Sequence, residues 1–506
     1  MKKIITCLLF SYSICAYGQT SGELIKNILS KKELNQSPHF RSVLLVQQFY
    51  QVNNYCLSWI EPEDSTLTKS LIDLIHSAGE FGLQQDDYAI NFESISKTAA
   101  LSQLDKVSAD MHLTDVFIQF LNDLKFGKKP LLKYDGIRYQ PDYSIIPSVL
   151  FQYSSHHQLN LLMETIEPNN VEYKAFRKII THLWRQMHAP GFSEVIIRSN
   201  VVSLSNKPLI TKLFQLGLLD SAYALDEKLL EKKLRQAQTL LNVLSDGILR
   251  STSLAELNVP ILKRWQEASM ALNMVRWFDG WRNQTSIAIL NIPSASLFVY
   301  YNDTLSLYSR IVVGKPFTPT PTLSSTITQI VVYPYWHVPN KIATKELLPL
   351  IKQNTAFLTS NNFQILSKDG RVLDPNSIPW QTLSISNFPY TIRQSTGCDN
   401  ALGLLKFEFY SPYGVYLHDT PDKGLFFLNK RYFSHGCMRI EEAPELAQFL
   451  LKQRMTEINT LIGKCLKDQK PRTLKIDKPI NFVVFYSTVW YTEKNEIVFY
   501  GNPYKK

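Results

Sequence analysis

The sequence is poor in cysteine, with 6 among 506 residues, and charged residues make up 19% of it. Cysteine this sparse excludes a small scaffold held together by disulfides. The chain lacks Cys-x-x-Cys and His-x-x-x-His pairs and any zinc-finger, helix-turn-helix or RNA-binding signature, so we expect no nucleic-acid partner. No run approaches the ~18 consecutive apolar residues of a membrane span. A hydrophobic content of 45% is instead typical of an ordinary globular protein.

The length and the charge set broad limits on organisation. At 506 residues the chain is too long for a single hydrophobic core, so roughly two to four domains are expected. The net charge of +10 is spread along the chain without a long Lys/Arg block. Such a charge fits attraction to an anionic cell envelope, and it fits a simple solvated basic surface equally well.

The first residues have the pattern of a secretory signal peptide. Lys2 and Lys3 give a charged start, Ile4–Phe10 is apolar, and Ala16-Tyr17-Gly18 provides small residues for cleavage. We therefore expect residues 1–18 to be removed and the mature protein to be exported to the periplasm or cell envelope.

Four cysteines remain after that segment: Cys56, Cys398, Cys437 and Cys465. An oxidising compartment permits disulfides, yet a catalytic thiol has to stay reduced. If Cys437 is that thiol, the other three cannot all pair. A bridge between Cys398 and Cys465 is left open at this stage.

The most specific motif is Ser434-His435-Gly436-Cys437-Met438-Arg439, which follows His418 in Tyr416-Leu417-His418-Asp419. A thiol is a nucleophile as its thiolate, and an imidazole is the usual group that takes its proton. The apolar run before His418 predicts a strand that ends near the turn carrying Cys437. This arrangement predicts a cysteine acyl-transfer site.

Two other interpretations compete with it. Free cysteine is often buried as a small hydrophobe, although the polar neighbours Ser434, His435 and Arg439 would then need buried partners. Alternatively, His418, His435 and Cys437 could supply the three ligands of a catalytic zinc. The nucleophile is favoured over both, so no metal and no cofactor are expected.

With its neighbouring segments, the motif resembles the L,D-transpeptidase catalytic domain of bacterial cell-wall enzymes. Further similarity lies in four segments: Asn291-Ile292-Pro293, Val312-Val313-Gly314-Lys315-Pro316, Tyr333-Pro334-Tyr335-Trp336-His337-Val338-Pro339 and Asn400-Ala401-Leu402-Gly403. The resemblance extends over most of the chain and is strongest from about residue 285 to 450. It points to the large, multi-domain members of the family.

The resemblance implies a reaction and partners. Cys437 would attack a peptidoglycan tetrapeptide stem, release D-alanine and form a thioester. A diaminopimelate amine of a second stem would then resolve it, giving a 3→3 cross-link. Glycan strands are a further expected partner. Three alternatives stay open: a wall carboxypeptidase or hydrolase with the same thiol, a transferase that joins the wall to a protein, and a non-catalytic wall-binding protein.

The resemblance also implies roles for individual residues. His418 would be the base, oriented by the backbone carbonyl of Asp419. The backbone N–H groups of His435, Gly436 and Cys437 are expected to bind the oxyanion. Ser434, Asp419 and Arg439 are expected to support the site. Arg439 would bind a substrate carboxylate or brace the loop. Four aromatic residues are expected to line the cleft: Trp336, Tyr390, Tyr413 and Tyr416.

Periodicity divides the rest of the chain into a multi-domain α+β protein. The expected parts are a helical region at 22–190, three short helices at 200–259, a mainly-β region at 285–455 and a closing hairpin at 470–503. The resemblance implies that the first three are a scaffold domain, a peptidoglycan-binding-like module and the catalytic domain, the last with a capping insertion at 340–395. The insertion is expected to hold a helix at 343–351 and a Pro-rich aromatic loop. The 200–259 module is expected either to grip glycan or to act as a spacer.

Overall fold

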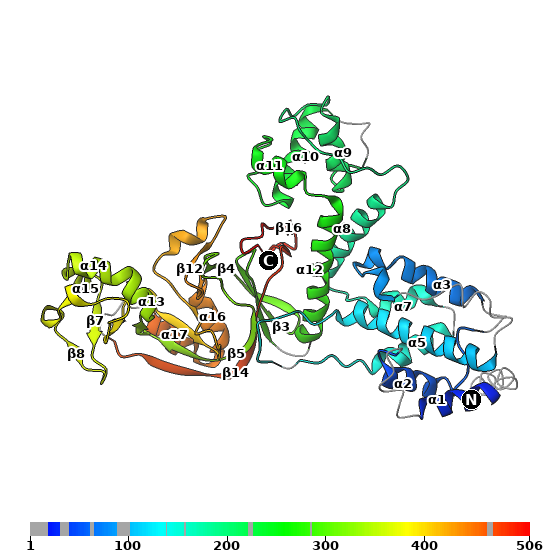
Figure 1. Ribbon diagram of the computed structural model, residues 1–506, viewed down its shortest axis with the longest axis horizontal. Helices are drawn as coiled ribbons and strands as arrows, with labels where there is room; N and C mark the ends of the chain where they lie inside the picture. The colour runs from blue at the N-terminus through cyan, green and yellow to red at the C-terminus, as the bar shows by residue number, and fades with distance from the viewer. Residues whose placement is uncertain are drawn as a thin grey trace. The chain divides into compact units, whose positions relative to one another are not determined.

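The protein is described by a computed structural model that covers residues 19–30, 40–60, 65–88, 102–137, 139–155, 158–220, 226–283, 286–462 and 469–505 (Figure 1). The expected signal peptide and Cys465 lie outside the described residues. Contacts divide the chain into two units. Unit 1 contains Met1–Pro130, Gln140–Gly280 and Val489–Tyr500, and unit 2 contains Leu131–Tyr139, Trp281–Thr488 and Gly501–Lys506.

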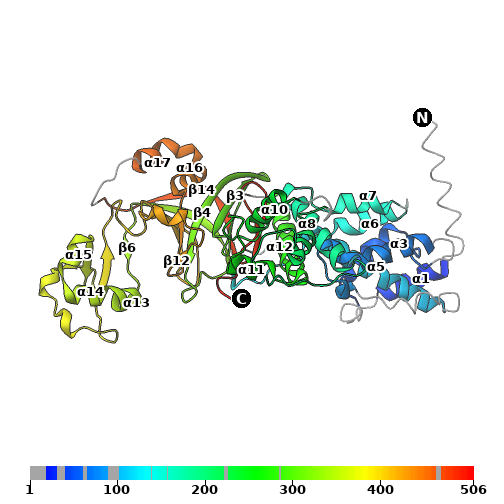
Figure 2. The ribbon, with the colours of Figure 1, turned by 90° about the horizontal axis from the view of Figure 1, so that it is seen from above.

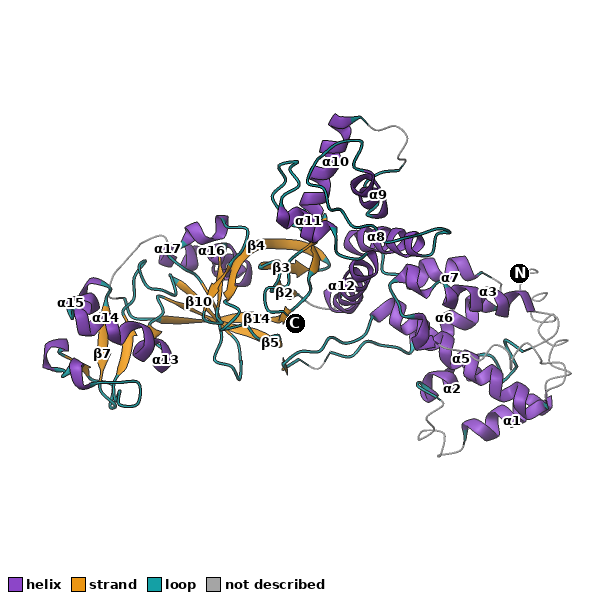
Figure 3. Ribbon diagram, turned by 45° about the horizontal axis from the view of Figure 1, so that its top comes forward, coloured by secondary structure: helices purple, strands orange, loops and turns teal. Residues whose placement is uncertain are grey.

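Unit 1 is helical, as Figure 3 shows in purple. Its α-helices are α1 (Gln19–Leu29), α2 (Val43–Val52), α3 (Ser65–His76), α5 (Gln103–Phe126), α6 (Ile145–Ser154), α7 (Leu159–Ile166), α8 (Val171–Met187), α9 (Lys207–Gln215), α10 (Glu227–Leu240), α11 (Ser251–Leu257) and α12 (Ile261–Arg282). Among the described residues, none of the helices combines the length and apolarity needed to cross a bilayer.

A buried carboxylate organises the amino-terminal helices around α5. Asp110 is fully buried, accepts a 2.6 Å hydrogen bond from the Tyr50 hydroxyl and another of 2.6 Å from the backbone of Trp59. Burial raises the pKa of Asp110 to about 6, while these hydrogen bonds oppose the rise. Its polar partners keep the burial tolerable, and they tie the segment after α2 to α5.

Three short helices, α9 to α11, follow the predicted order. Asp226 is the N-cap of α10, where its side chain accepts a 2.6 Å hydrogen bond from Leu229, as its residue type predicts. At α11 the N-cap position is taken by Arg250, and Ser251 is the first helical residue. A hairpin of β15 (Val489–Tyr491) and β16 (Ile497–Phe499) also belongs to unit 1.

Unit 2 is built on a closed sheet. Its strands are β1 (Tyr134–Asp135), β2 (Ile287–Asn291), β3 (Ser296–Tyr301), β4 (Thr304–Gly314), β5 (Leu323–Val332), β10 (Leu405–Glu408), β11 (Leu417–His418), β12 (Tyr432–Ser434), β13 (Met438–Ile440) and β14 (Arg472–Phe485). The order β5-β10-β11-β13-β4-β3-β2-β14 closes on itself because β14 pairs with both β2 and β5. With the helical unit 1, this makes the chain a multi-domain α+β protein, which confirms the predicted class.

Helices α16 (Ala443–Leu450) and α17 (Met455–Ile462) follow β13. Pro444 lies in the first turn of α16, as predicted, where its missing N–H costs no helical hydrogen bond. The long strand β14 begins at Arg472, near the start of the closing hairpin expected at 470–503, but it does not pair within that segment. The strand instead joins the two edges of the sheet and forms the barrel closure.

Apolar and polar residues alternate along three neighbouring strands, so that one face of the strands packs into the core and the other carries polar side chains. One face of β10, β11 and β13 contributes buried apolar residues to the core: Leu405, Phe407, Leu417, Met438 and Ile440. Successive side chains of a strand point to opposite faces. The other face therefore carries the polar residues of this region: Lys406, Glu408, Tyr416, His418, Cys437 and Arg439.

The capping insertion is a small α/β body with its own core. Its sheet has the order β6-β9-β7-β8, from β6 (Trp336–His337), β7 (Phe363–Leu366), β8 (Val372–Leu373) and β9 (Thr391–Gln394). Figure 2 shows β6 with the cap helices α13 (Asn340–Ile342), α14 (Leu348–Gln353) and α15 (Ala356–Ser360). The prediction of a Pro-rich loop was therefore wrong. The strands of this segment are too short for an alternation of apolar and polar residues to be recognised in the sequence.

The cap helix contains a π-turn. Residues Ala343–Leu347 are π-helical between α13 and α14, and Pro349 lies in the first turn of α14. Proline has no N–H and its ring clashes with the carbonyl four residues earlier, so the ordinary helical ladder cannot continue through this position. The widened turn carries Glu346, which contacts the catalytic motif described below.

Candidate active site

Strand pairing brings the two motif blocks together. β11 runs parallel to β13 with Leu417 opposite Met438 and His418 opposite Arg439. The Met438 N–H donates a 3.0 Å hydrogen bond to the Tyr416 carbonyl. This register sets Tyr416 beside Cys437 and places His418 diagonally across from the same cysteine.

Cys437 is a free, partly buried thiol. Burial raises the pKa of the Cys437 thiol, while hydrogen bonds from Tyr416 and the positive charges of Lys406 and Arg439 act in the opposite direction. Because burial dominates, the resting group is a protonated thiol at neutral pH. A base therefore has to take the proton when the sulfur reacts, and the surrounding donors and cations can stabilise the thiolate as it forms.

Tyr416 is the closest polar partner of the sulfur. Its side chain and its backbone N–H both hydrogen-bond to Cys437, and the Trp336 side chain hydrogen-bonds to Tyr416. Burial raises the pKa of Tyr416 well above its usual value, so the phenol keeps its proton and can donate it. Of the four aromatic residues expected in the cleft, Tyr416 contacts the thiol and Trp336 contacts Tyr416.

The other two aromatic residues lie elsewhere in unit 2. Tyr390 packs against the core of the cap, with its ring 6.0 Å from that of Phe388. The Tyr413 hydroxyl donates a 3.0 Å hydrogen bond to the Lys133 carbonyl, and its side chain is exposed. Neither contact involves Cys437 or His418, so a place for Tyr390 and Tyr413 in the cleft stays a prediction.

His418 is a buried, neutral imidazole. Its side chain is 4% exposed, and Nδ1 lies 2.5 Å from the Asp419 carbonyl oxygen. A carbonyl can accept but not donate, so Nδ1 carries the proton and Nε2 is the basic nitrogen. Burial, followed by the charge of Arg439, lowers the pKa of His418 to about 3.

The Asp419 side chain supports the surrounding loops. One carboxylate oxygen accepts a 2.8 Å bond from Lys423, and the other accepts a 3.0 Å bond from the Leu404 N–H. Gly403 packs against this carboxylate at φ +60, where an added Cβ would lie 2.4 Å from it. Asp419 therefore orients His418 through its backbone carbonyl and holds the neighbouring turn through its side chain.

The turn that carries the cysteine is held by Ser434. The Ser434 hydroxyl accepts a 3.1 Å hydrogen bond from the Gly436 N–H and donates to the Cys437 carbonyl. Gly436 has φ +116, a conformation that favours glycine. Because its N–H is used inside the turn, the expected oxyanion role of that amide is corrected, and the amides of His435 and Cys437 remain as candidate donors.

Two threonines that the sequence did not single out brace the same turn. Thr320 is fully buried, donates a 2.9 Å hydrogen bond to the Gly436 carbonyl and accepts one of 2.9 Å from Gly314. Thr318 donates a 3.1 Å bond to the Ser434 carbonyl, which also accepts from Lys315. The available sequence signal was their place just after Gly314-Lys315-Pro316, a segment that already resembled the family.

Thr320→Val is expected to loosen the nucleophile turn. Valine matches threonine in size but leaves the Gly314 N–H and the Gly436 carbonyl without their partner, at a cost of roughly 1–3 kcal/mol. We expect a lower Tm and a fall in the rate of Cys437 acylation of about 10-fold. Thr318→Val is the matched control, because Ser434 keeps its bond from Lys315. Equal acylation rates in both variants would contradict this role for Thr320.

Arg439 is held as a brace. Its guanidinium lies 3.1 Å from the Asp422 carboxylate, and its side chain is 22% exposed. The positive charge also lowers the pKa of both Cys437 and His418. This pairing supports the bracing role over direct capture of a substrate carboxylate.

His435 connects the nucleophile turn to the cap. Its Nε2 lies 2.8 Å from Glu346 on the π-turn, and both side chains are partly exposed. The zinc alternative would have required His435 beside His418 and Cys437. Among the described residues, no cluster of three or more His, Cys, Asp or Glu side chains is arranged to hold a metal.

The remaining cysteines leave the nucleophile untouched. Cys398 is disulfide-bonded, whereas Cys56 and Cys437 form no disulfide. A cystine between Cys437 and Cys398 would have removed the nucleophile, and the free state of Cys437 excludes it.

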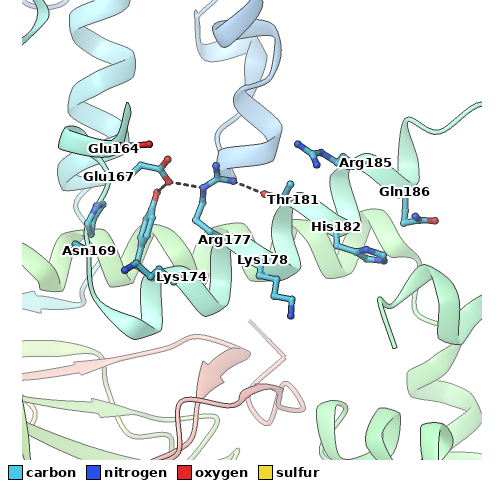
Figure 4. Close-up of a pocket in the computed structure, with 12 residues that line it drawn as sticks. Glu164, Glu167, Asn169, Lys174, Arg177, Lys178, Thr181, His182, Arg185 and Gln186 are labelled. Carbon is cyan, nitrogen blue, oxygen red and sulfur yellow. Dashed lines mark hydrogen bonds and ion pairs between the residues drawn. The ribbon is translucent and has the colours of Figure 1, made fainter. Parts of the chain in front are cut away.

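A cavity of ≈ 920 Å³ lies along α8 in unit 1 (Figure 4). Within its lining, Arg177 pairs with Glu167 at 2.7 Å, and Arg185 reaches Glu80 outside the lining at 2.8 Å. The cavity lining contains no cysteine, and the thiol chemistry lies in unit 2.

Comparisons with known proteins agree with the motif. Residues 285–459 match the model of the L,D-transpeptidase catalytic domain, and residues 44–179 match a scaffold domain. A Haemophilus influenzae protein whose name assigns it to the L,D-transpeptidases is 37% identical over 209 residues. That match covers 41% of this chain and 42% of the relative, so the chain spans less than half of the relative's length.

Solved structures of L,D-transpeptidases show a weaker, partial likeness. An L,D-transpeptidase from Mycobacterium smegmatis is 12% identical with a TM-score of 0.20, over 40% of this chain and 58% of that one. L,D-transpeptidase 3 from Mycobacterium tuberculosis is 11% identical with a TM-score of 0.20, over 40% and 61%.

Proposed function

We propose that this chain, which carries an L,D-transpeptidase catalytic domain at residues 285–459, forms 3→3 cross-links in peptidoglycan with Cys437 as the nucleophile. The observation that carries the proposal is the shared polar face of β10, β11 and β13. On this face a free thiol, a neutral imidazole and a phenol donor lie together.

The first half of the proposed reaction forms a thioester. His418 takes the Cys437 proton, and the sulfur attacks the carbonyl that precedes the terminal D-alanine of a tetrapeptide stem. The amides of His435 and Cys437 bind the developing oxyanion. As the C–N bond breaks, the proton passes from His418 to the leaving amine, and D-alanine departs.

The second half of the reaction transfers the acyl group. The side-chain amine of a diaminopimelate residue on another stem attacks the thioester carbonyl. A C–N bond forms as the C–S bond breaks, and the electron pair and a proton return to Cys437. The partly covered site supports transfer over hydrolysis, because a thioester in open water reacts with water first.

The remaining domains fit a cell-envelope enzyme. We propose that the chain acts after export, with residues 1–18 as its signal peptide and the scaffold domain at 44–179 supporting the catalytic domain. Whether the α9–α11 helices hold glycan or act as a spacer is a separate proposal. Two cavities at this module, of ≈ 610 and ≈ 520 Å³, are lined by charged, polar and aliphatic side chains among the described residues.

The proposal is tested by incubating the protein with disaccharide-tetrapeptide and reading the products by mass spectrometry. We expect a thioester adduct on Cys437 with loss of D-alanine, followed by dimers joined through two diaminopimelate residues. Trimmed monomers without dimers would assign the hydrolase alternative instead. If no adduct forms on Cys437, the proposed nucleophile is wrong.

Glu346→Ala is expected to shift the products from transfer towards hydrolysis. The exposed Glu346–His435 pair contributes only about 0–1 kcal/mol to stability, so Tm should barely change. Losing the contact between cap and turn should let water reach the thioester more often. The measured quantity is the ratio of trimmed monomers to dimers, which we expect to rise roughly several-fold. Asp369→Ala removes another exposed cap pair, with Arg371, and should leave the ratio unchanged.

A further inference from the structure

The polar face of the site contains a charged pair that the proposed reaction has not yet used. Lys406 and Glu408 are two residues apart on β10 and point to the same face, with Nζ 2.8 Å from the Glu408 carboxylate. Lys406 lies opposite His418 in the strand pairing, and Glu408 continues the register towards Tyr416. The pair therefore borders the residues that surround the thiol.

Stability does not explain this pair. The side chains are 25% and 39% exposed, and ion pairs of that exposure contribute roughly 0–1 kcal/mol. The Lys406 ammonium also lies over the Tyr416 ring, 4.6 Å from its centroid. Its position is thereby fixed beside the phenol that hydrogen-bonds to Cys437.

The charge of Lys406 reaches the reacting groups. It lowers the pKa of the Cys437 thiol and that of the His418 imidazole. Arg439 is the other cation that acts on both groups, and it is engaged by Asp422. Lys406 is therefore a cation near the sulfur whose own carboxylate partner is partly exposed and can exchange for another anion.

We propose that Lys406 and Glu408 recognise the acceptor as an α-amino acid, with Lys406 holding the carboxylate and Glu408 the ammonium group on the same carbon. The proposal rests on the proposed transpeptidation. One cation and one anion side by side match a zwitterion, and the reactive end of a diaminopimelate side chain carries both an amine and a carboxylate. The scissile end of a donor stem is its terminal D-alanine, where the nitrogen beside the carboxylate is already an amide, so that end would leave Glu408 unmatched.

The pair also fits the second half of the reaction. The ammonium held by Glu408 loses one proton to solvent, and the resulting amine attacks the thioester carbonyl. The new C–N bond forms as the C–S bond breaks, and the second nitrogen proton returns to the sulfur through His418. Lys406 and Glu408 thus act on acceptor choice, and neither forms a covalent bond.

The test compares two small acceptors on a preformed thioester. D-methionine has a carboxylate next to its amine, whereas D-methioninamide does not. We expect the wild-type protein to transfer to D-methionine faster, and Lys406→Gln to lower that rate by about 10-fold while changing the D-methioninamide rate by less than about 2-fold. Lys406→Arg should restore most of the preference, since arginine also binds carboxylates. Glu408→Gln should weaken binding of both acceptors, because each carries the ammonium.

The ratio of the two rates separates acceptor recognition from every effect on the sulfur. A change in thiol reactivity alters the D-methionine and D-methioninamide rates equally, so it cancels in their ratio. Arg371→Gln, which disrupts an exposed cap pair with Asp369, is the matched control and should leave the ratio unchanged. An unchanged ratio in Lys406→Gln, with normal thioester formation, overturns this inference alone. Failure to form any thioester on Cys437 in the wild-type protein would instead overturn the proposed function.

Discussion

Cys437→Ala is expected to abolish both thioester formation and cross-linking, a loss of at least about 10⁴-fold. The methyl group removes the nucleophile itself, and no other side chain on this face of the sheet can replace it: Tyr416 keeps its proton, because burial raises its pKa. The measurement is mass spectrometry of the protein and of its muropeptide products. Alanine keeps the β-carbon and removes a single, partly buried sulfur atom, so the fold should survive and Tm should change little.

Cys56→Ala is the matched control for that loss. Cys56 is the other partly buried cysteine of the described residues that forms no disulfide, and it belongs to unit 1. Its removal should leave acylation unchanged. Full cross-linking by the Cys437→Ala protein would show that the chain binds the wall without catalysis, which is the non-enzymatic alternative that the sequence left open.

His418 and Cys437 could be singled out from the sequence as candidate base and nucleophile because their signals are local. His418 and Cys437 lie in short blocks at a fixed spacing, and both flanking strands alternate between apolar and polar residues. Alternation determines which side chains share a face, so it already places Lys406 and Glu408 with the site. The helical half of the chain was predictable for the same reason, as the Asp226 cap of α10 illustrates.

Contacts between distant segments could not be predicted in the same way. Thr320 reaches Gly436 across 116 residues, and Glu346 reaches His435 across 89. Nothing in the composition of either segment specifies its partner, because the contact arises from the barrel and the cap as folded bodies. The barrel itself depends on β14, whose pairing with both β2 and β5 is a long-range feature without a local pattern.

His418→Gln is expected to lower the rate of Cys437 acylation at neutral pH by about 10²–10⁴-fold. The thiol is protonated at rest because burial raises its pKa, so attack needs a base, and glutamine cannot take a proton. Raising the pH should partly rescue the variant, since hydroxide then ionises the thiol directly. His188→Gln, at an exposed imidazole that follows α8, is the control and should react normally.

The pH profile distinguishes this mechanism from a resting thiolate–imidazolium pair. The pKa of His418 is lowered to about 3, so the imidazole is neutral and able to accept a proton throughout the range from pH 5 to 9. Alkylation of Cys437 by iodoacetamide should therefore rise with pH and reach its midpoint above that of an ordinary thiol, without a step near pH 6.5. A fast, pH-independent reaction down to pH 5 would instead mean that the sulfur is ionised before substrate binds. In that case His418 would serve to hold the thiolate by its positive charge, and the burial of both groups would have to be relieved in solution.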